Sequence, residues 1–281
     1  MKTTWRWLAP VEGPGAFHMA ADVAIAEAAR AGQARPALRV YRWTPPCVTL
    51  GKFQPADGNV RLDACARLGY DVVRRPTGGR AILHDHEVTF SIIIAEDDLP
   101  GAGANIMESY RALGRALVDG LRRLGLPAEL VDRRASARAA DPPSVMAAGN
   151  PACFAAKARC DLMVGGKKLI GSAQLRKEGI IVQQNSLPLT IDFPRWDDVF
   201  YRSDWEQVMR AGAVGLHDCA GRPIPYDDVV AALRAGFEAA LDIRFEDGAL
   251  SAEEERRAWE LLPDYAVLTA GTRAAPAPFN S

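Results

Sequence analysis

The sequence has few cysteines, no excess of either charge and no long apolar run. Its five cysteines are an odd number and lie far apart, which argues against a disulfide-stapled scaffold. Lys and Arg total 34 against 35 Asp and Glu, so the basic excess of a typical nucleic-acid-binding protein is missing. The longest strongly apolar stretch, residues 88–95, is too short to cross a bilayer, and the first residues contain no signal-peptide core. We therefore expect a cytoplasmic protein of enzyme size, with no membrane and no nucleic-acid partner.

Lysine is also scarce, because the chain has 28 arginines but only six lysines. Four of the six fall in one segment, at Lys157, Lys167, Lys168 and Lys177. Where arginine is the default cation, a lysine can be retained for an amine that loses its proton or lies along an acyl chain. The alternative is a chance cluster of charges on a solvated loop.

The composition is otherwise that of a folded protein. Hydrophobic residues make up 48% of the 281 residues and charged residues 25%, which is enough to fill a sizeable core. No internal repeat or low-complexity linker divides the chain. We expect one domain over residues 1–281, with a mainly helical part from about residue 200.

Hydrophobic periodicity predicts both helices and strands. Helices are expected over 16–30, 106–124 and 229–241, and strands over 38–43 and 88–94, where apolar residues alternate with Thr89 and Ser91. Gly165-Gly166 between two apolar runs predicts a hairpin over 161–170. Ser251 and Glu254 form a capping box for a helix that should stop before Pro263. Strands interspersed with helices indicate an α+β fold with a mixed, largely antiparallel sheet flanked by helices.

The first candidate site is the segment 74–81, Arg-Arg-Pro-Thr-Gly-Gly-Arg-Ala, which follows a predicted strand at 71–73. Adjacent glycines let a backbone approach a ligand closely and point its N–H groups at an oxygen or anion. The spacing matches neither a P-loop nor a dinucleotide fingerprint. A tight hairpin between two strands remains the alternative for this segment.

The second candidate is the run His-Asp-His-Glu at 84–87. On a strand, His84 and His86 would share a face and could hold a metal. No Cys or third His lies at a recognised ligand spacing, so we expect no metal site. We predict instead that one histidine lines a polar pocket and that the other lies at the surface.

The third candidate is Cys153, in a loop that precedes the predicted hairpin. A thiolate is a nucleophile, and a nearby ammonium lowers the pKa of a thiol. Lys168, on the second strand of the hairpin, would act in this way if the loop folds back over the strands. The alternatives are that Cys153 is an oxidation-prone surface thiol and that Cys160 is the nucleophile. Cys47 and Cys65, among apolar neighbours, are expected in the core.

Taken together, these segments resemble the lipoate-protein ligase and biotin ligase catalytic domain family, and most of all its LipM-type octanoyltransferase branch. The resemblance begins at residues 4–6 and 16–20 and continues through 40–43 and 49–54. Its specific parts are Arg-Arg-Pro-Thr-Gly-Gly-Arg-Ala-Ile-Leu-His-Asp at 74–85 and Gly-Lys-Lys-Leu-Ile-Gly-Ser-Ala-Gln at 166–174. It covers nearly the whole chain.

The resemblance implies a mixed sheet flanked by helices, with an acyl chain held beside the Gly-Gly loop. Lys168 stands at the family's site lysine, and Cys153, in Cys-Phe, stands at the acylated nucleophile of the transferase branch. The residues that follow, 155–160, depart from the usual Ala-Pro-Ser and aromatic pattern, which leaves the loop conformation and the role of Cys160 open. The implied acyl-binding residues are Arg75, Thr77, Gly78, Gly79, His84, Gly171, Ser172 and Ala173.

The implied activity is transfer of an octanoyl group from octanoyl-acyl carrier protein to a lysine of a lipoyl domain or of the glycine cleavage H protein. No ATP, other cofactor or metal is expected, since the steps from thioester to thioester to amide run downhill. One rival is an ATP-dependent lipoate ligase on the same fold, in which Cys153 is incidental; Arg80, where ligases commonly carry a third glycine, counts against it. The others are a non-catalytic acyl-binding module and a thioesterase.

Overall fold

The computed structural model describes residues 2–56, 60–99, 105–132, 160–201 and 205–269. Eight strands form a large sheet in the order β11-β1-β2-β6-β10-β9-β8-β7, and four form a small sheet in the order β12-β4-β3-β5. In the large sheet β1 pairs in parallel with β2 and β11, and the remaining pairs are antiparallel. The predicted α+β class with a mixed, largely antiparallel sheet is thus confirmed.

The large sheet is built from strands taken from nearly the whole chain. They are β1 (Thr3–Gly13), β2 (Ala37–Trp43), β6 (Glu87–Ala95), β7 (Glu129–Asp132), β8 (Cys160–Val164), β9 (Lys167–Lys177), β10 (Ile180–Pro188) and β11 (Ile243–Gly248). The small sheet comprises β3 (Cys47–Leu50), β4 (Asp71–Arg74), β5 (Ile82–His84) and β12 (Ala266–Leu268). The predicted strands at 38–43 and 88–94 and the hairpin at 161–170 are therefore present.

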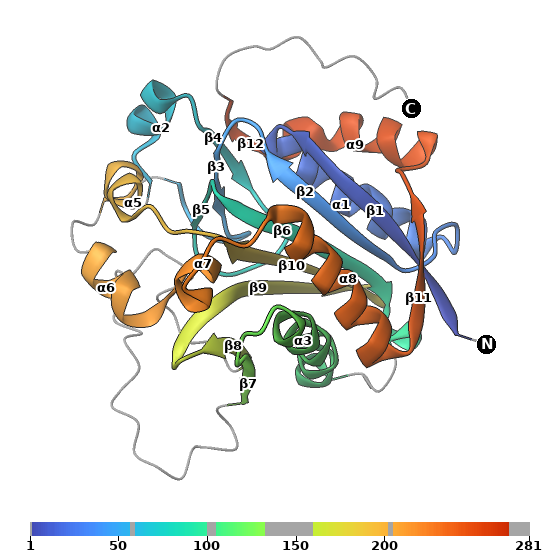
Figure 1. Cartoon of the computed structure of the whole chain (residues 1–281). Helices are drawn as coiled ribbons and strands as arrows, with labels where there is room; N and C mark the ends of the chain where they lie inside the picture. The colour runs from blue at the N-terminus through green and yellow to red at the C-terminus, as the bar shows by residue number, and fades with distance from the viewer. Residues whose placement is uncertain (1, 57–59, 100–104, 133–159, 202–204, 270–281) are drawn as a thin grey trace.

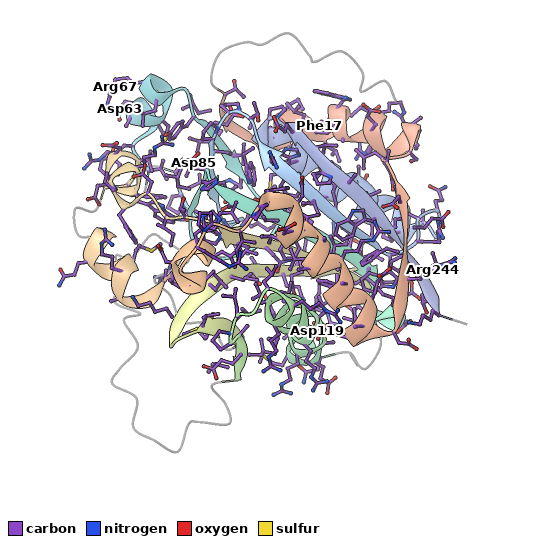
Figure 2. The ribbon with its side chains drawn as sticks, viewed as in Figure 1. Phe17, Asp63, Arg67, Asp85, Asp119 and Arg244 are labelled. Carbon is purple, nitrogen blue, oxygen red and sulfur yellow. The ribbon has the colours of Figure 1, made fainter. Side chains whose placement is uncertain are left out.

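Helices cover both faces of the large sheet, as Figure 1 shows. They are α1 (Gly15–Arg30), α2 (Leu62–Leu68), α3 (Ile106–Arg123), α5 (Phe193–Val199), α6 (Trp205–Gly212), α7 (Leu216–Ala220), α8 (Tyr226–Leu241) and α9 (Ala252–Tyr265), with a 3-10 turn η1 (Glu96–Asp98). Helices α3 and α8 pack together on one face, and α1 and α9 pack together on the other. Phe17 of α1, labelled in Figure 2, lies 4.6 Å from the ring of Trp259 of α9.

The main apolar core lies between the large sheet and the α3–α8 pair. Leu113, Leu117 and Leu121 on α3 are buried there, as their helical spacing predicts. Ile106 belongs to the same apolar stripe of the helix as these leucines, but it is exposed in the first turn of α3. The stripe is thus buried only from the second turn of the helix onward.

One expectation about where a helix ends is wrong, and the hairpin alternative for the segment 74–81 is ruled out. Helix α9 runs through Pro263 to Tyr265, because the proline removes one N–H donor within the last turn while Leu262 and Tyr265 pack against the core. The segment 74–81 is not a hairpin, since β4 and β5 do not pair with each other. Strand β3 lies between them, parallel to β4 and antiparallel to β5. The stretch 134–150 is rich in Ala, Pro and Ser, which predicts an exposed connection, and it lies outside the described residues.

Candidate active site

The central strands present an apolar face to the core and a polar face to α1 and the small sheet. On β6, Val88, Phe90 and Ile92 point into the main core. Side chains alternate across a strand, so the intervening Thr89 and Ser91 lie on the opposite face. Both are buried, so they line an internal polar surface.

A narrow cavity lies over this polar face, enclosed by the large sheet, the small sheet and α1. Its empty volume is about 350 Å³, the open mouth included. The lining residues are Met19, Tyr41, Trp43, Thr49, Arg75, Ile82, His84, Thr89, Gly171, Ser172, Ala173, Gln184, Asn185 and Ser186. Five residues predicted to bind an acyl group are among them, from both sequence motifs, although Gly171 follows Arg75 by 96 positions in the chain.

His84 is the histidine that lines this cavity, as predicted. Its ring stacks on Trp43 at 4.3 Å between centroids, and its Nε2 lies 2.8 Å from Thr49 Oγ1. Its Nδ1 lies 2.7 Å from a carboxylate oxygen of Glu87. His86 is exposed and bonds to Thr190 Oγ1 at 2.8 Å, so the second prediction for this run is also confirmed.

Glu87 is a buried carboxylate whose two oxygens accept hydrogen bonds from the cavity wall. Trp43 Nε1 lies 3.3 Å from one oxygen, and Ser186 Oγ lies 2.7 Å from the other. Burial acts to raise the pKa of Glu87, but the neighbouring His84 and the bonds from His84, Thr89 and Ser186 outweigh it and hold the pKa below its usual value. Glu87 therefore carries its charge at neutral pH.

Arg75 holds the Gly-Gly loop in shape. Its Nη2 donates to the carbonyl oxygens of Gly78 at 2.7 Å and Arg80 at 2.8 Å, and its Nη1 donates to Thr49 Oγ1 at 3.1 Å. The Gly-Gly loop and strand β3 are thereby tied to one buried guanidinium. The described geometry makes Arg75 a support of the loop as well as part of the cavity wall.

Thr77 connects the same loop to helix α1. Its hydroxyl donates to Gln184 Oε1 at 2.8 Å, and Gln184 Nε2 donates to Asp22 Oδ2 at 2.8 Å. Asp22 is fully buried and forms an ion pair with Arg39 at 3.1 Å. Because a carboxylate only accepts, Asp22 fixes which end of the Gln184 amide faces Thr77.

The two glycines of the loop have different surroundings. Gly79 has φ of +95°, a conformation that favours glycine. Its carbonyl group lies against Gly51, where a Cβ would come within 2.8 Å of the Gly79 carbonyl carbon. A Cβ at Gly78 would meet nothing within 4 Å. The close approach is therefore between residues 51 and 79.

Lys168 is buried and forms an ion pair with Asp161, at 2.9 Å between Nζ and Oδ1. The solvated-loop alternative for this lysine is thus wrong. Cys153 and Lys157 lie outside the described residues, as does the side chain of Cys160, so the expected Cys153–Lys168 pair stays a prediction. Cys47 and Cys65 are buried as expected, and burial raises the pKa of Cys65 to about 11.

Sequence reasoning missed several residues of the site, among them Asp22, Glu87, Asp161 and Gln184. Glu87 carries a signal that could have been used, because it continues the alternation of Thr89 and Ser91 on the polar face of β6. Asp22 lies within an alanine-rich helix, where a lone carboxylate at a buried position indicates a partner. Its partner Arg39 lies on strand β2, and no local sequence pattern identifies the pair.

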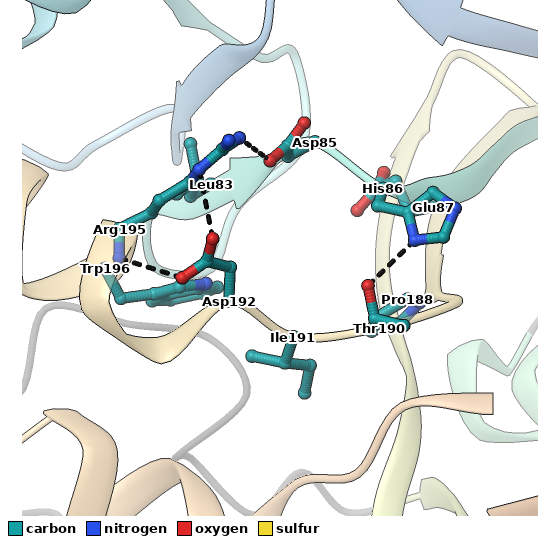
Figure 3. Close-up of a pocket in the computed structure, with 10 residues that line it drawn as sticks. All are labelled: Leu83, Asp85, His86, Glu87, Pro188, Thr190, Ile191, Asp192, Arg195 and Trp196. Atoms are coloured by element: carbon teal, nitrogen blue, oxygen red, sulfur yellow. Dashed lines mark hydrogen bonds and ion pairs between the residues drawn. The ribbon is translucent and has the colours of Figure 1, made fainter. Parts of the chain in front are cut away.

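A second, wider cavity, whose empty volume with its open mouth is about 820 Å³, lies on the other side of the β5–β6 turn, shown in Figure 3. Arg195 lies between Asp85 and Asp192 and forms ion pairs with both. Glu87 borders this cavity, but its oxygens are engaged by the network described above. Arg195, Asp85 and Asp192 are thus paired with one another, and Glu87 is paired with groups of the first cavity.

Two kinds of feature are absent from the described residues. No group of three or more His, Cys, Asp or Glu side chains there could hold a metal ion. No helix in the described part of the chain is long and apolar enough to cross a membrane.

Comparison with known proteins agrees with this geometry. The model of the lipoyl protein ligase A/B catalytic domain matches residues 14–238. The chain belongs to this family. It is 40% identical over 270 residues to octanoyltransferase LipM of Kyrpidia tusciae, covering 93% of this chain and 96% of that protein. It is also 40% identical to octanoyltransferase LipM of Symbiobacterium thermophilum, over 93% of this chain and 95% of that protein.

Solved structures of the family have the same fold. Lipoate-protein ligase A bound with ATP superposes with a TM-score of 0.73 at 27% identity, covering 94% of this chain and 95% of that one. A lipoate-ligase-type protein of Thermoplasma acidophilum with bound lipoic acid gives 0.72 at 28% identity, with the same coverage. The sheet and helix arrangement described above is therefore that of the family.

Proposed function

We propose that this protein is an octanoyltransferase that moves an octanoyl group from octanoyl-acyl carrier protein to a lysine of a lipoyl domain or of the glycine cleavage H protein, in the cytoplasm. The observation that carries the proposal is the cavity that unites the two sequence motifs, with Arg75 and His84 from one and Gly171, Ser172 and Ala173 from the other. The LipM relatives at 40% identity support the same reaction.

The reaction proceeds in two steps, acylation of the enzyme and transfer of the acyl group to the acceptor. The Cys153 thiolate attacks the thioester carbonyl of the donor, a carbon–sulfur bond to Cys153 forms, and the pantetheine sulfur leaves as a thiolate. The acceptor amine then attacks the octanoyl-enzyme, a carbon–nitrogen bond forms, and Cys153 leaves as a thiolate while the amine releases a proton to water. Lys168 supplies positive charge close to the oxygen on which negative charge develops. No step consumes ATP.

The walls of the cavity suit an acyl chain. Met19, Tyr41, Trp43 and Ile82 offer apolar surface, and the polar groups behind them bond to one another. Removing methylene groups from water contributes roughly 0.8 kcal/mol for each one buried. An octanoyl chain thus gains binding energy here without needing a polar contact.

The deciding experiment is an intact mass measurement of the purified protein after incubation with octanoyl-acyl carrier protein and no ATP. We expect a gain of one octanoyl group that hydroxylamine reverses, that is absent in Cys153→Ser and that persists in the matched control Cys160→Ser. Addition of a lipoyl domain should then discharge the enzyme and modify the domain. Modification of the domain only with ATP and free acid would refute the proposal and favour a ligase, which ATP–pyrophosphate exchange would confirm.

A further inference from the structure

The hairpin of β8 and β9 places Lys168 and Asp161 on one face of the sheet. Gly165 and Gly166 both have positive φ, 57° and 76°, so the turn spans two residues and Met163 stands opposite Lys168. Residues opposite each other share a face, and so do residues two apart along a strand. Asp161 is therefore the diagonal neighbour of Lys168.

A bulge in β9 then puts Lys168 on the same face of the strand as the cavity-lining Gly171. Leu162 pairs with Ile170, so Leu169 is an extra residue between the pairs. After the bulge Ile170 turns to the apolar core with Leu162. Because side chains alternate along a strand, the next residue, Gly171, lies on the same face as Lys168, and Gly171 lines the cavity. In an unbulged strand Lys168 and Gly171 would lie on opposite faces.

The backbone of Lys168 is held on its other side by the segment before α7. Val214 N donates to Lys168 O at 3.1 Å, and Lys168 forms an isolated bridge with Ala213. The side chains of Lys168 and Asp161 are only 6% and 2% exposed. Burying an ammonium group removes its hydration, and a counter-ion in contact with it compensates that loss. Asp161 is such a counter-ion at 2.9 Å.

We infer that Asp161 is the positioning residue of Lys168: its carboxylate keeps the Lys168 amine protonated and fixes its place on the cavity face of β9. The inference rests on the proposed octanoyl transfer. An ammonium that stays charged cannot accept the proton of the acceptor amine, so Lys168 acts as a fixed positive charge in both steps. The proton of the acceptor amine goes to water, as in the scheme above.

The scarcity of lysine makes a direct test practical. Lysine labelled with ¹³C at Cε gives at most six NMR signals, and Lys168→Arg assigns the one of interest. We expect that signal at the ammonium position in the wild-type protein at about pH 8 and at the neutral-amine position in Asp161→Asn. Asp161→Glu, which keeps the carboxylate, should restore the ammonium signal.

The kinetic arm uses octanoyl-acyl carrier protein as donor. Asp161→Asn should lower kcat for enzyme acylation by about 10- to 100-fold with KM within about threefold, because the lost charge acts mainly on the transition state. Asp161→Glu should recover most of kcat. Glu254→Gln is the matched control: it removes the charge of another buried carboxylate, paired with Arg6 at 2.6 Å, and should leave kcat unchanged.

The possible results distinguish the inference about Asp161 from the proposed octanoyl transfer. A neutral Lys168 in the wild-type protein overturns the inference without any variant, and so does an Asp161→Asn protein with an ammonium signal and wild-type kcat. Absence of an octanoyl-enzyme in the wild-type protein refutes the proposed function, while the NMR signals still decide whether Asp161 controls the charge of Lys168.

Discussion

Replacing Gly51 by alanine should displace the Gly-Gly loop while leaving the rest of the fold in place. The added Cβ would overlap the carbonyl oxygen of Gly79 and lie 2.8 Å from its carbonyl carbon, where real Cβ contacts essentially never fall below 3.0 Å. Both atoms belong to backbone, so no side-chain rotation relieves the overlap. The loop must move by about 1 Å, and a misplacement of that size typically costs about 100-fold in rate.

The assay is steady-state transfer of octanoyl from octanoyl-acyl carrier protein to a lipoyl domain. We expect kcat/KM of Gly51→Ala to fall by about 100-fold, with effects on both kcat and KM, because the loop is part of the acyl site. Gly69→Ala is the matched control. Gly69 has φ of +71° at the end of α2 with nothing within 4 Å of its Cβ position, so alanine there should cost about 1 kcal/mol of stability and no activity. Wild-type kinetics for Gly51→Ala would refute the reasoning.

Three further predictions concern single contacts. Burial and then the Arg39 charge hold the pKa of His18 well below its usual value, so the folded state disfavours the protonated imidazole. The free energy of unfolding should therefore fall as the pH drops below about 6.5, by at most about 1.4 kcal/mol per pH unit. Urea unfolding of the wild-type protein and of His18→Gln at several pH values should show a smaller loss in the variant. Thr77→Val removes the donor to Gln184 Oε1 and should raise KM for the donor several-fold, whereas Thr77→Ser should not; equal KM values would contradict the role of the bond. Ser251→Ala breaks the capping box of α9 and should lower the free energy of unfolding by about 1 kcal/mol with octanoyl transfer unchanged, and a change in kcat would show that α9 reaches the site.

Local patterns in the sequence predict much of this site. The alternation through β6 identified a strand with a polar side at Thr89 and Ser91, and Thr89 on that side lines the cavity. The Gly165-Gly166 turn identified the hairpin that carries Lys168. The acyl-binding residues themselves came from the resemblance to a family, since neither motif shows by its spacing that it meets the other.

Other features depend on partners that are distant in the chain. Strand β3 enters between β4 and β5, and β11 pairs with β1 across the whole length of the protein. The bulge at Leu169 depends on the match between β8, β9 and the core, so the sequence of the hairpin alone leaves it open. Pro263 misleads for the same reason, since packing of Leu262 and Tyr265 outweighs the single hydrogen bond that the proline removes.

The polar groups of the cavity wall are satisfied before any substrate enters, and this bears on how an acyl chain is recognised. Asp22 accepts bonds from Arg39, Ser91 and Gln184, and Glu87 is satisfied in the same way by its own neighbours. Breaking such a buried set costs several kcal/mol, so the network resists rearrangement. An octanoyl chain has no polar group along its length with which to order the wall around itself. A wall ordered in advance loses little entropy on binding. Such a wall does not adjust to a displaced loop, so a loop shift of about 1 Å should weaken both substrate binding and the reaction.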